Sequence, residues 1–204
     1  MITSLIQRVQ KTQHGFTDIL RTADEVFASR SSTETLSLAK ELFASEIHQA
    51  RVLAVFLFGK LAAKSKVSFT FLRKQVSKDK DWRVQETLAK AFDQYCSDTG
   101  YEKAFPIIKD WLSDANPNVR RAVTEGLRIW TSRDYFREHP DIAIKLLSQL
   151  KADESEYVRK STGNALRDIS RKHKDLIQKE LQRWDISDKH ILQTYKLASK
   201  FLQS

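Results

Sequence analysis

Two carboxylates and a tryptophan stand at spacings that a helical surface could use for chemistry. Trp82 and Glu86 are four residues apart in "DWRVQETLAKAFDQY", and Glu125 stands between Arg121 and Arg128 in "NPNVRRAVTEGLRIW". Residues three or four apart share one face of a helix. A carboxylate can stabilise developing positive charge or orient water, an arginine can hold a phosphate, and a tryptophan can stack on a cationic ring. These spacings predict helices that present acidic, basic and aromatic groups together.

Surface ion pairing is the alternative explanation for the carboxylates. Glu125 reaches Arg121 at i−4 and Arg128 at i+3, and such pairs stabilise a helix by only about 0.2–0.5 kcal/mol each. The alternative for Trp82 is packing at the start of its helix, but its position opposes the apolar face, which favours a functional use. Geometry alone leaves function and ion pairing equal for Glu86 and Glu125.

The elements that position these side chains are predicted to be helices throughout. The 204 residues include only 5 glycines and 3 prolines, and apolar residues recur at i, i+3 and i+4 along nearly the whole chain. Three segments align without gaps, and their first residues, Val84, Val119 and Val158, are 35 and 39 residues apart. Each follows a shorter amphipathic segment, and "ARVLAVFLFGKLA" from Ala50 is an earlier copy. Helix pairs at this period predict an all-α, right-handed solenoid of HEAT-like repeats.

We expect one repeat domain over residues 1–204. Residues 1–30 and 172–204 are predicted to cap the repeats of residues 31–171. Residues 97–99 and 131–140 are predicted to be loops.

An aspartate stands six residues before an arginine in two of the copies. Asp114 precedes Arg120 and Asp153 precedes Arg159 at this spacing, which is typical of the ladder that joins neighbouring HEAT repeats. Both arginines are therefore assigned to the architecture. In the first copy Gln85 takes the basic position, which predicts a weaker ladder there.

A helical wheel of about 100° per residue separates a buried face from a charged stripe in each copy. The buried face is predicted to carry Val84, Leu88, Ala91, Phe92 and Tyr95, then Val119, Val123, Gly126, Leu127 and Trp130, then Val158, Thr162, Ala165, Leu166 and Ile169. The stripe carries Trp82, Glu86 and Asp93, then Arg121, Glu125 and Arg128, then Lys160, Asn164, Arg167 and Arg171. Trp111 and Trp184 are expected to be structural. Because second helices of successive repeats line the concave side of a solenoid, we expect a basic groove with an acidic and aromatic patch.

The charge of the chain favours a polyanionic partner for such a groove. Lys and Arg number 35 against 26 Asp and Glu, a formal net charge of +9, and nucleic acid is the commonest partner of so basic a domain. The alternative is scattered lysines without such a partner. Carboxylates in the groove would repel DNA, so they should serve chemistry or pair with the arginines. The residues alone rank a DNA-binding protein first and an enzyme second.

Other classes find little support in the sequence. Cys96 is the only cysteine, so one chain holds no disulfide and no cysteine-based metal site, which fits a reducing, cytoplasmic setting. The five histidines are dispersed and give a zinc site no local support. No apolar run is long enough for a membrane span, and the N-terminus lacks the pattern of a signal peptide.

The motifs "DWRVQETLAKAFDQY", "NPNVRRAVTEGLRIW" and "SEYVRKSTGNALRDIS" resemble the DNA alkylation repair glycosylases of the AlkC/AlkD superfamily. The resemblance covers residues 50–175, and the sequences of these motifs are more similar to the AlkC branch. It implies a HEAT-like fold and the excision of cationic 3-methyladenine-type bases without metal or cofactor. It also implies alkylated duplex DNA as partner, a monomer, and a bacterial cytoplasmic protein associated with the nucleoid. Neither the immunoglobulin-like domain of some AlkC proteins nor their full N-terminal region is expected.

The resemblance to the AlkD branch assigns roles to single residues. Trp82 and Glu86 match a concave tryptophan and, four residues later, an aspartate. Arg121 matches an arginine on the phosphate side. Asn164 matches the place of a second lesion-facing tryptophan, so that aromatic group is missing.

The implied chemistry needs a carboxylate beside the sugar. A base alkylated at N3 or N7 is already a good leaving group, and positive charge develops on the deoxyribose, where a carboxylate stabilises it. The AlkC branch relies on acids from several repeats, which makes Glu86, Glu125 and Asp168 the candidate catalytic residues. Trp82 and Asn164 would contact the lesion or sugar, and the DNA backbone would be held by Arg121, Arg128, Lys160, Arg167 and Arg171.

These roles predict a monofunctional glycosylase, since no lysine is singled out for a Schiff base. Two alternatives stay open. One is a HEAT-repeat protein that binds DNA structure without catalysis, and the other is a scaffold for an acidic protein.

Overall fold

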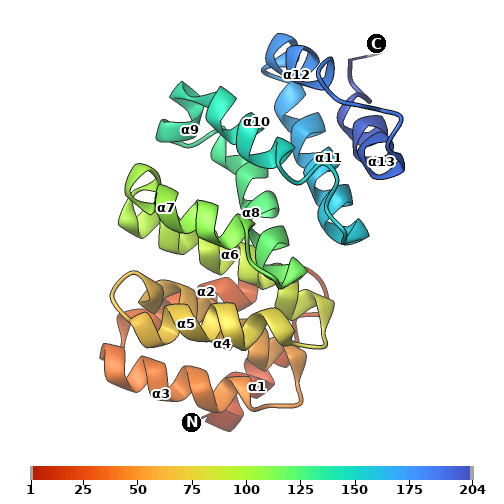
Figure 1. The fold of residues 1–204 in the computed structure, drawn as a ribbon. Coiled ribbons are helices and arrows are strands. Elements are labelled where there is room, and N and C mark those ends of the chain that lie inside the picture. Colours follow the sequence, from red (N-terminus) through yellow and green to blue (C-terminus); the bar gives the residue numbers. More distant parts are fainter. Residues whose placement is uncertain (1, 203–204) are drawn as a thin grey trace. The chain divides into compact units, whose positions relative to one another are not determined.

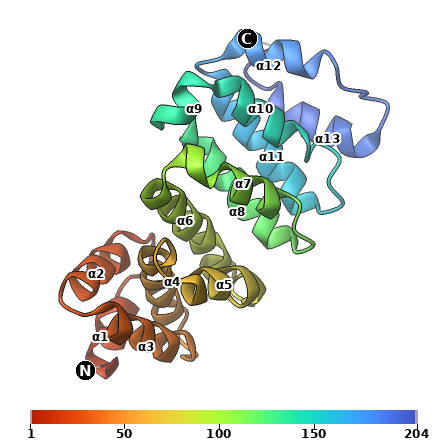
Figure 2. The ribbon, with the colours of Figure 1, turned by 60° about the vertical axis from the view of Figure 1, so that its left-hand side comes forward.

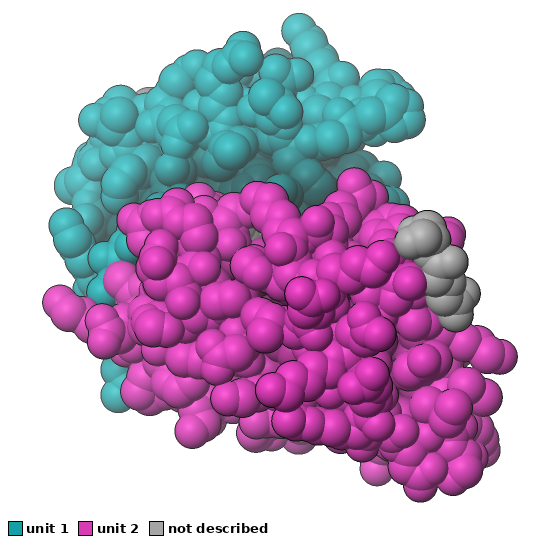
Figure 3. Space-filling view, turned by 90° about the horizontal axis from the view of Figure 1, so that it is seen from above, with its two compact units in different colours: residues 1–99 teal, residues 100–204 magenta. Residues whose placement is uncertain are grey.

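The structure is a computed structural model and describes residues 2–202 (Figure 1). Within these residues every regular element is a helix. The all-α prediction is confirmed for these residues. The chain divides into unit 1, residues 1–99, and unit 2, residues 100–204, which are coloured separately in Figure 3. The prediction of one repeat domain stays a prediction, and residues 203–204 of its C-terminal cap lie outside the described residues.

Unit 1 is built around one helix that is apolar on all sides. Its elements are α1 (Ile2–Gln10), α2 (Thr17–Ala28), α3 (Ser32–Phe43), α4 (His48–Ala62), α5 (Lys66–Lys74), the 3-10 helix η1 (Val76–Lys78) and α6 (Trp82–Thr99). Helix α4 packs against α1, α2, α3, α5 and α6, and Figure 2 shows it among them. Residues 50–59 are all buried, which explains the almost continuous apolar sequence there. Gly59 lets α4 and α6 meet, because a Cβ at this position would lie 2.9 Å from the Cα of Ala91.

Unit 2 places α11 between two other second helices. Its elements are α7 (Tyr101–Leu112), α8 (Pro117–Trp130), α9 (Asp134–Glu138), α10 (Pro140–Ser148), α11 (Glu156–Ser170), α12 (Lys174–Leu181) and α13 (Lys189–Ala198). Helix α11 packs against both α8 and α13. A Cβ at Gly163 would lie 2.7 Å from Leu197 Cβ and 2.9 Å from the Thr194 carbonyl oxygen, so only glycine permits this approach of α11 and α13. The predicted neighbourhood of successive second helices is confirmed within each unit.

The predicted buried faces are confirmed with one exception. All the predicted positions are buried except Tyr95, which is half-buried. Its ring lies across that of Phe69, with 4.3 Å between the centroids. The predictions for Trp111 and Trp184 are confirmed, since both side chains are buried.

The loop predicted at residues 97–99 is wrong, and the loop predicted at residues 131–140 is wrong in part. Residues 97–99 continue α6, which stops only at Gly100, where φ is +89° and glycine alone is unstrained. Residues 134–138 form the short helix α9, which buries the side chain of Phe136. Its ring stacks on that of Trp130 with 5.4 Å between the centroids. Polar composition therefore predicted a loop where α6 continues and overstated the length of the loop before α10.

Two arginines, the half-buried Arg120 and the buried Arg159, join successive helix pairs in unit 2. Arg120 Nε lies 2.7 Å from Asp153 Oδ2, and its Nη1 donates at 2.7 Å to the backbone oxygen of Asp114. Arg159 repeats this arrangement: its Nη1 donates to the backbone oxygen of Asp153, and its Nε donates at 2.7 Å to Gln193 Oε1. The six-residue spacing thus serves a backbone contact, and the aspartate side chain pairs with the arginine of the preceding repeat. The architectural assignment of both arginines is confirmed.

Unit 1 contains the same kind of arginine–aspartate ion pair, at a position that the repeat alignment did not single out. Arg51 Nε lies 2.8 Å from Asp79 Oδ2, and both side chains are buried. Gln85 stands in the place of the arginine in its own repeat and donates at 2.6 Å to the backbone oxygen of Asp79. The contact to the preceding loop therefore survives the replacement by glutamine.

Candidate functional site

An aspartate sets the start of α6 and holds the arginine beside Trp82. The Asp81 carboxylate accepts a hydrogen bond from the backbone N–H of Arg83 at 3.0 Å and pairs with its guanidinium, with 2.7 Å from Nη2 to Oδ2. The hydrogen bond from Arg83 lowers the pKa of Asp81 to about 2. The charge of Arg83 is therefore balanced within its own turn.

Trp82 and Glu86 lie one turn apart on α6 and share a cavity. The Trp82 side chain is 65% exposed, on the side of the helix opposite the buried Val84 and Leu88. Glu86 is half-buried, and both residues line a cavity of about 460 Å³ in unit 1. The Glu86 carboxylate makes no hydrogen bond or ion pair with any residue from 2 to 202. Its charge is thus available to a group that enters the cavity.

The other walls of the cavity come from the loop between α1 and α2 and from the start of α4. Gly15 turns this loop with φ of +74°, a conformation that other residues rarely adopt. Phe16 follows it and packs edge-on against Phe56, with 6.4 Å between the ring centroids. His48 also lines the cavity, and burial, with the nearby charge of Arg83, lowers the pKa of its imidazole. His48 is therefore neutral at pH 7.

Glu125 of unit 2 is held by three partners. Its Oε2 lies 2.9 Å from Arg128 Nη1, and its Oε1 lies 3.8 Å from Arg121 Nη2. Ser161 of α11 donates its hydroxyl to the same Oε1 and accepts a hydrogen bond from Thr124 at 2.9 Å. The structure confirms that Glu125 and both arginines share one face of α8. It adds a serine on the next helix that the spacing did not reveal.

Asp168 of α11 is the second carboxylate bound to Arg128. Arg128 Nη2 lies 2.7 Å from Asp168 Oδ2, and Arg167 Nη2 lies 3.0 Å from Oδ1. Burial alone would raise the pKa of Asp168, but the hydrogen bonds from the two arginines outweigh it and place the pKa below its usual value. Arg128 thus bridges Glu125 and Asp168, and one guanidinium ties α8 to α11.

The remaining predicted cations lie along α11. Lys160 pairs with Glu156 at 2.6 Å and is more than half exposed. The guanidiniums of Arg167 and Arg171 lie 5.6 and 4.7 Å from the centroid of the Phe201 ring. Chain beyond α13 therefore helps to position two predicted DNA-binding residues.

Asn164, the predicted lesion contact of the same helix, is half-buried. It stands where the resemblance implied that a tryptophan is missing, and the structure shows another aromatic group on α11. Tyr157 is 73% exposed, and the guanidinium of Arg121 lies 6.0 Å from its ring centroid. Tyr157 precedes Val158 by one residue, so a wheel of about 100° per residue places it beside the charged stripe. That position was the signal that could have identified it.

The predicted site residues form two groups. The structure brings together Arg121, Glu125 and Arg128 of α8 with Asp168 of α11 in unit 2, and it brings Trp82 and Glu86 together in unit 1. Their convergence in one groove stays a prediction.

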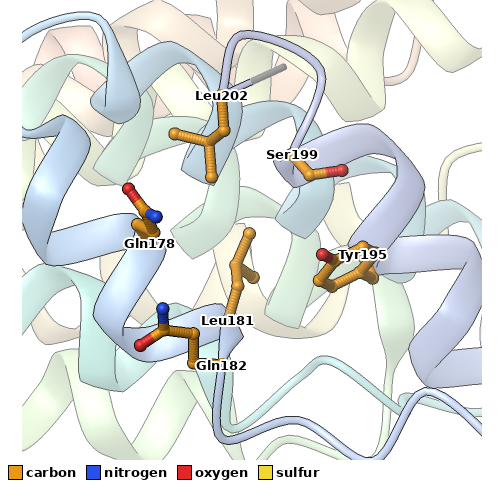
Figure 4. A pocket seen from close by; sticks show the side chains of 6 residues that line it. All are labelled: Gln178, Leu181, Gln182, Tyr195, Ser199 and Leu202. Atoms are coloured by element: carbon orange, nitrogen blue, oxygen red, sulfur yellow. The ribbon is translucent and has the colours of Figure 1, made fainter.

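A second cavity, of about 220 Å³, lies in unit 2 between α12 and α13. Figure 4 shows Gln178, Gln182 and Leu181 facing Tyr195 and Ser199 across it, with Leu202 at one side. None of these side chains is charged, and none belongs to the predicted site.

No helix within residues 2–202 combines the length and apolar composition that a membrane crossing requires. The same residues contain no group of three or more His, Cys, Asp or Glu side chains placed to hold a metal ion.

Known proteins are similar to this chain in sequence or in fold. AlkD2 from Streptococcus mutans, whose crystal structure is known, is 49% identical to this chain in sequence. The two structures match with a TM-score of 0.96 over 100% of this chain and 98% of that one. The alkylpurine DNA glycosylase AlkC of Pseudomonas fluorescens, bound to DNA with an abasic site analogue, is 19% identical, with a TM-score of 0.55 over 97% of this chain and 63% of that one. At that identity the likeness shows the fold alone. The uncharacterised protein YhaZ of Bacillus subtilis is 37% identical over 87 residues, which are 41% of this chain and 24% of that protein.

These matches confirm the HEAT-like fold class and the resemblance to the superfamily. The higher identity to AlkD2 than to AlkC favours the former as the nearer of these two structures. Residues 15–198 match the family described as DNA alkylation repair enzyme. The chain therefore belongs to the DNA alkylation repair enzyme family.

Proposed function

We propose that the protein is a monofunctional DNA glycosylase that hydrolyses the N-glycosidic bond of cationic, N-alkylated bases in duplex DNA. The observation that carries the proposal is the shared cavity of Trp82 and Glu86, in which the carboxylate has no cationic partner among residues 2–202. Membership of the family and the fold shared with an alkylpurine glycosylase bound to DNA support it.

Glu86 supplies the charge that the reaction lacks. The alkylated base departs without being protonated, so the barrier lies in the positive charge that develops on the deoxyribose. A carboxylate beside the sugar stabilises that charge and orients the water that attacks it, each effect worth roughly 10²–10³ in rate. The Trp82 ring favours the cationic base or sugar by about 0.5–2 kcal/mol.

Glu125 and Asp168 have a different role in this proposal. Both carboxylates are neutralised by arginines, so they hold Arg128 between α8 and α11 in place of stabilising the sugar. Arg128 gives three N–H groups to these carboxylates, which leaves the rest of its fork for a phosphate. Arg121, Lys160, Arg167 and Arg171 complete the surface that holds the DNA backbone.

The test is release of methylated base from methylated duplex DNA under single-turnover conditions. Wild type should release base, Glu86→Gln should lower the rate by roughly 10²-fold, and Glu125→Gln should lower it by less than tenfold. Asp98→Asn, an exposed carboxylate on the same helix, is the matched control and should act as wild type. Full activity of Glu86→Gln would refute the role of Glu86.

One observation favours a second function, the binding of DNA structure without catalysis. Two of the three predicted catalytic carboxylates, Glu125 and Asp168, are ion-paired and serve as braces for arginine. In that case wild type binds DNA, with an affinity that falls steeply with salt, and releases no base. A protein that fails to bind DNA even at low salt would instead be a scaffold for another partner.

A further inference from the structure

We propose that the exposed face of α5 and the turns at its two ends form a second DNA-binding surface, which holds a duplex by its phosphates. Four lysines make up this surface, which we call the α5 surface: Lys64, Lys66, Lys74 and Lys78. The inference goes beyond the proposed function, because it requires no catalysis and uses none of the predicted site residues. Such a surface would let one protein join two segments of DNA.

Most of the excess positive charge of the chain is concentrated around α5. Residues 47–78 contain seven Lys or Arg and no Asp or Glu, whereas the whole chain has a net charge of +9. Two of the seven have carboxylate partners, since Arg51 pairs with Asp79 and Lys60 pairs with Asp24. The four lysines of the α5 surface are exposed, and they make no ion pair with any residue from 2 to 202.

The predicted DNA-binding arginines of α8 and α11 differ in this respect. Arg121 and Arg128 share the carboxylate of Glu125, and Arg167 pairs with Asp168. A carboxylate beside a cation offsets part of its attraction for a phosphate. Each lysine of the α5 surface instead offers its full charge to a polyanion.

The spacing of the lysines suits the backbone of a duplex. At about 100° per residue, Lys66 and Lys74 lie about 80° apart on α5, and Val67, which is 54% exposed, lies beside them. A rise of about 1.5 Å per residue separates the two lysines by about 12 Å along the helix, close to the width of the major groove. Lys64 lies in the turn before α5, and Lys78 ends η1 after it. The lysines can therefore reach phosphates on both sides of one groove.

The α5 surface faces away from Trp82 and Glu86. Phe69 of α5 packs against Tyr95 of α6, with 4.3 Å between the ring centroids. On a wheel of about 100° per residue, Tyr95 lies on the side of α6 opposite Trp82 and Glu86. Helix α5 therefore covers one side of α6, while Trp82 and Glu86 occupy the other. A duplex held beside Trp82 leaves the α5 surface to another segment of DNA.

The lysines at the start of α5 do not serve the helix itself. Ser65 caps α5 by accepting a hydrogen bond from the backbone N–H of Ser68 at 3.2 Å. The N-terminus of a helix carries a partial positive charge, so Lys64 and Lys66 weaken the helix slightly, whereas acidic residues would strengthen it. An anionic partner outside the chain explains these charges, and the stability of α5 does not.

The other side chains of α5 favour a duplex over single-stranded DNA. Unpaired bases bind by stacking on accessible aromatic rings. The rings of α5 are used inside unit 1, where Phe69 packs on Tyr95 and Phe71 stacks on Phe58 with 4.4 Å between the centroids. Lysines contact phosphates as point charges and read no sequence. The α5 surface therefore fits the backbone of any duplex.

A capture assay tests whether the protein joins two duplexes. Protein is bound to a biotinylated duplex on beads, and capture of a second, fluorescent duplex is measured at increasing salt. We expect wild type to capture the second duplex, with a slope of log affinity against log salt of about −3 to −4 for four phosphate contacts. Capture should fall at least tenfold in a quadruple variant that still binds the first duplex: Lys64→Gln, Lys66→Gln, Lys74→Gln and Lys78→Gln.

The matched control removes the same charge from exposed lysines of unit 2. It combines four substitutions outside the predicted site: Lys103→Gln, Lys172→Gln, Lys179→Gln and Lys196→Gln. This variant should capture the second duplex as wild type does. Urea denaturation should give both quadruple variants the midpoint of wild type, because all eight side chains are exposed.

A photocrosslinker locates the bound DNA independently. Cys96 is the only cysteine and is buried, so Val67→Cys supplies an accessible thiol for a benzophenone label on the exposed face of α5. Leu176→Cys on α12, where the leucine is 38% exposed, is the control. We expect crosslinks to duplex DNA from position 67 and none from position 176.

The inference would be overturned by wild type that captures no second duplex, by equal capture in the two quadruple variants, or by crosslinks from position 176 alone. Loss of the first duplex in the Lys64 to Lys78 variant would reveal a single DNA surface and would also overturn it. So would wild type that binds phosphatidylserine vesicles through these lysines and captures no DNA.

The base-release assay separates this inference from the proposed function. A protein that captures the second duplex but releases no base contradicts only the glycosylase. One that releases base but captures no second duplex contradicts only the α5 surface.

Discussion

Removing Arg128 should loosen the contact between α8 and α11. Its guanidinium donates to Asp168 Oδ2 at 2.7 and 3.1 Å and to Glu125 Oε2 at 2.9 Å. The side chains of Arg128, Asp168 and Glu125 are 36%, 23% and 19% exposed. Exposed ion pairs contribute about 0.2–1 kcal/mol, and breaking a buried one costs about 3–5 kcal/mol. These partly exposed groups lie between the limits, so we expect Arg128→Met to lower the free energy of unfolding by about 2 kcal/mol.

A double-mutant cycle isolates the pair from other effects of the substitution. The free energies of unfolding of wild type, Arg128→Met, Asp168→Asn and the double variant are measured by urea denaturation at pH 7. We expect a coupling energy of about 1–2 kcal/mol. The same cycle with Lys160 and Glu156, an exposed pair at 2.6 Å, is the control and should give less than about 0.5 kcal/mol.

The coupling should also depend on pH, with a sign fixed by Asp168. Its pKa is lower in the folded than in the unfolded protein, so the pair stabilises fully above the unfolded value of about 3.9. The contribution declines as the pH falls below that value through the folded pKa. A coupling below about 0.3 kcal/mol at pH 7, or one that stays constant down to pH 2, would refute the assignment of Arg128 as a bridge.

Three further predictions concern the frame of the two units. Asp81→Asn should lower the free energy of unfolding by about 2 kcal/mol at pH 7, and the difference should vanish as the pH falls through the folded pKa of about 2, which pH-dependent urea denaturation would measure. Gly163→Ala should destabilise by about 1–3 kcal/mol in the same assay, because its Cβ would lie 2.7 Å from Leu197 Cβ; an unchanged midpoint would contradict the close contact of α11 and α13. Arg120→Ala should cost about 3 kcal/mol by leaving the Asp153 carboxylate, which is 5% exposed, without its cationic partner, whereas the exposed Arg171→Ala should cost less than about 0.5 kcal/mol.

Periodicity made most of the fold predictable. The aligned valines at 84, 119 and 158 indicate which face of each second helix is buried, because the buried positions follow each valine at the same helical spacings. The same register placed Glu125 between two arginines correctly, since both partners lie on its own helix.

Contacts between helices were harder to predict than contacts along them. The partners Asp168 and Ser161 of the α8 residues stand on α11, and Arg51 pairs with Asp79 from another helix pair. A single sequence gives the angle of a side chain on its own helix but not the neighbour it meets. The cavity in unit 1 could not be predicted for the same reason, because its walls come from a loop and three helices, α2, α4 and α6, which span distant parts of the sequence.

The direct test of the central claim is the rate of base release from methylated duplex DNA by wild type and Glu86→Gln, with DNA binding measured in parallel. We predict release by wild type and a loss of roughly 10²-fold in the variant, with DNA affinity unchanged. The claim would be contradicted by wild type that binds the DNA and releases no base, or by a variant as fast as wild type.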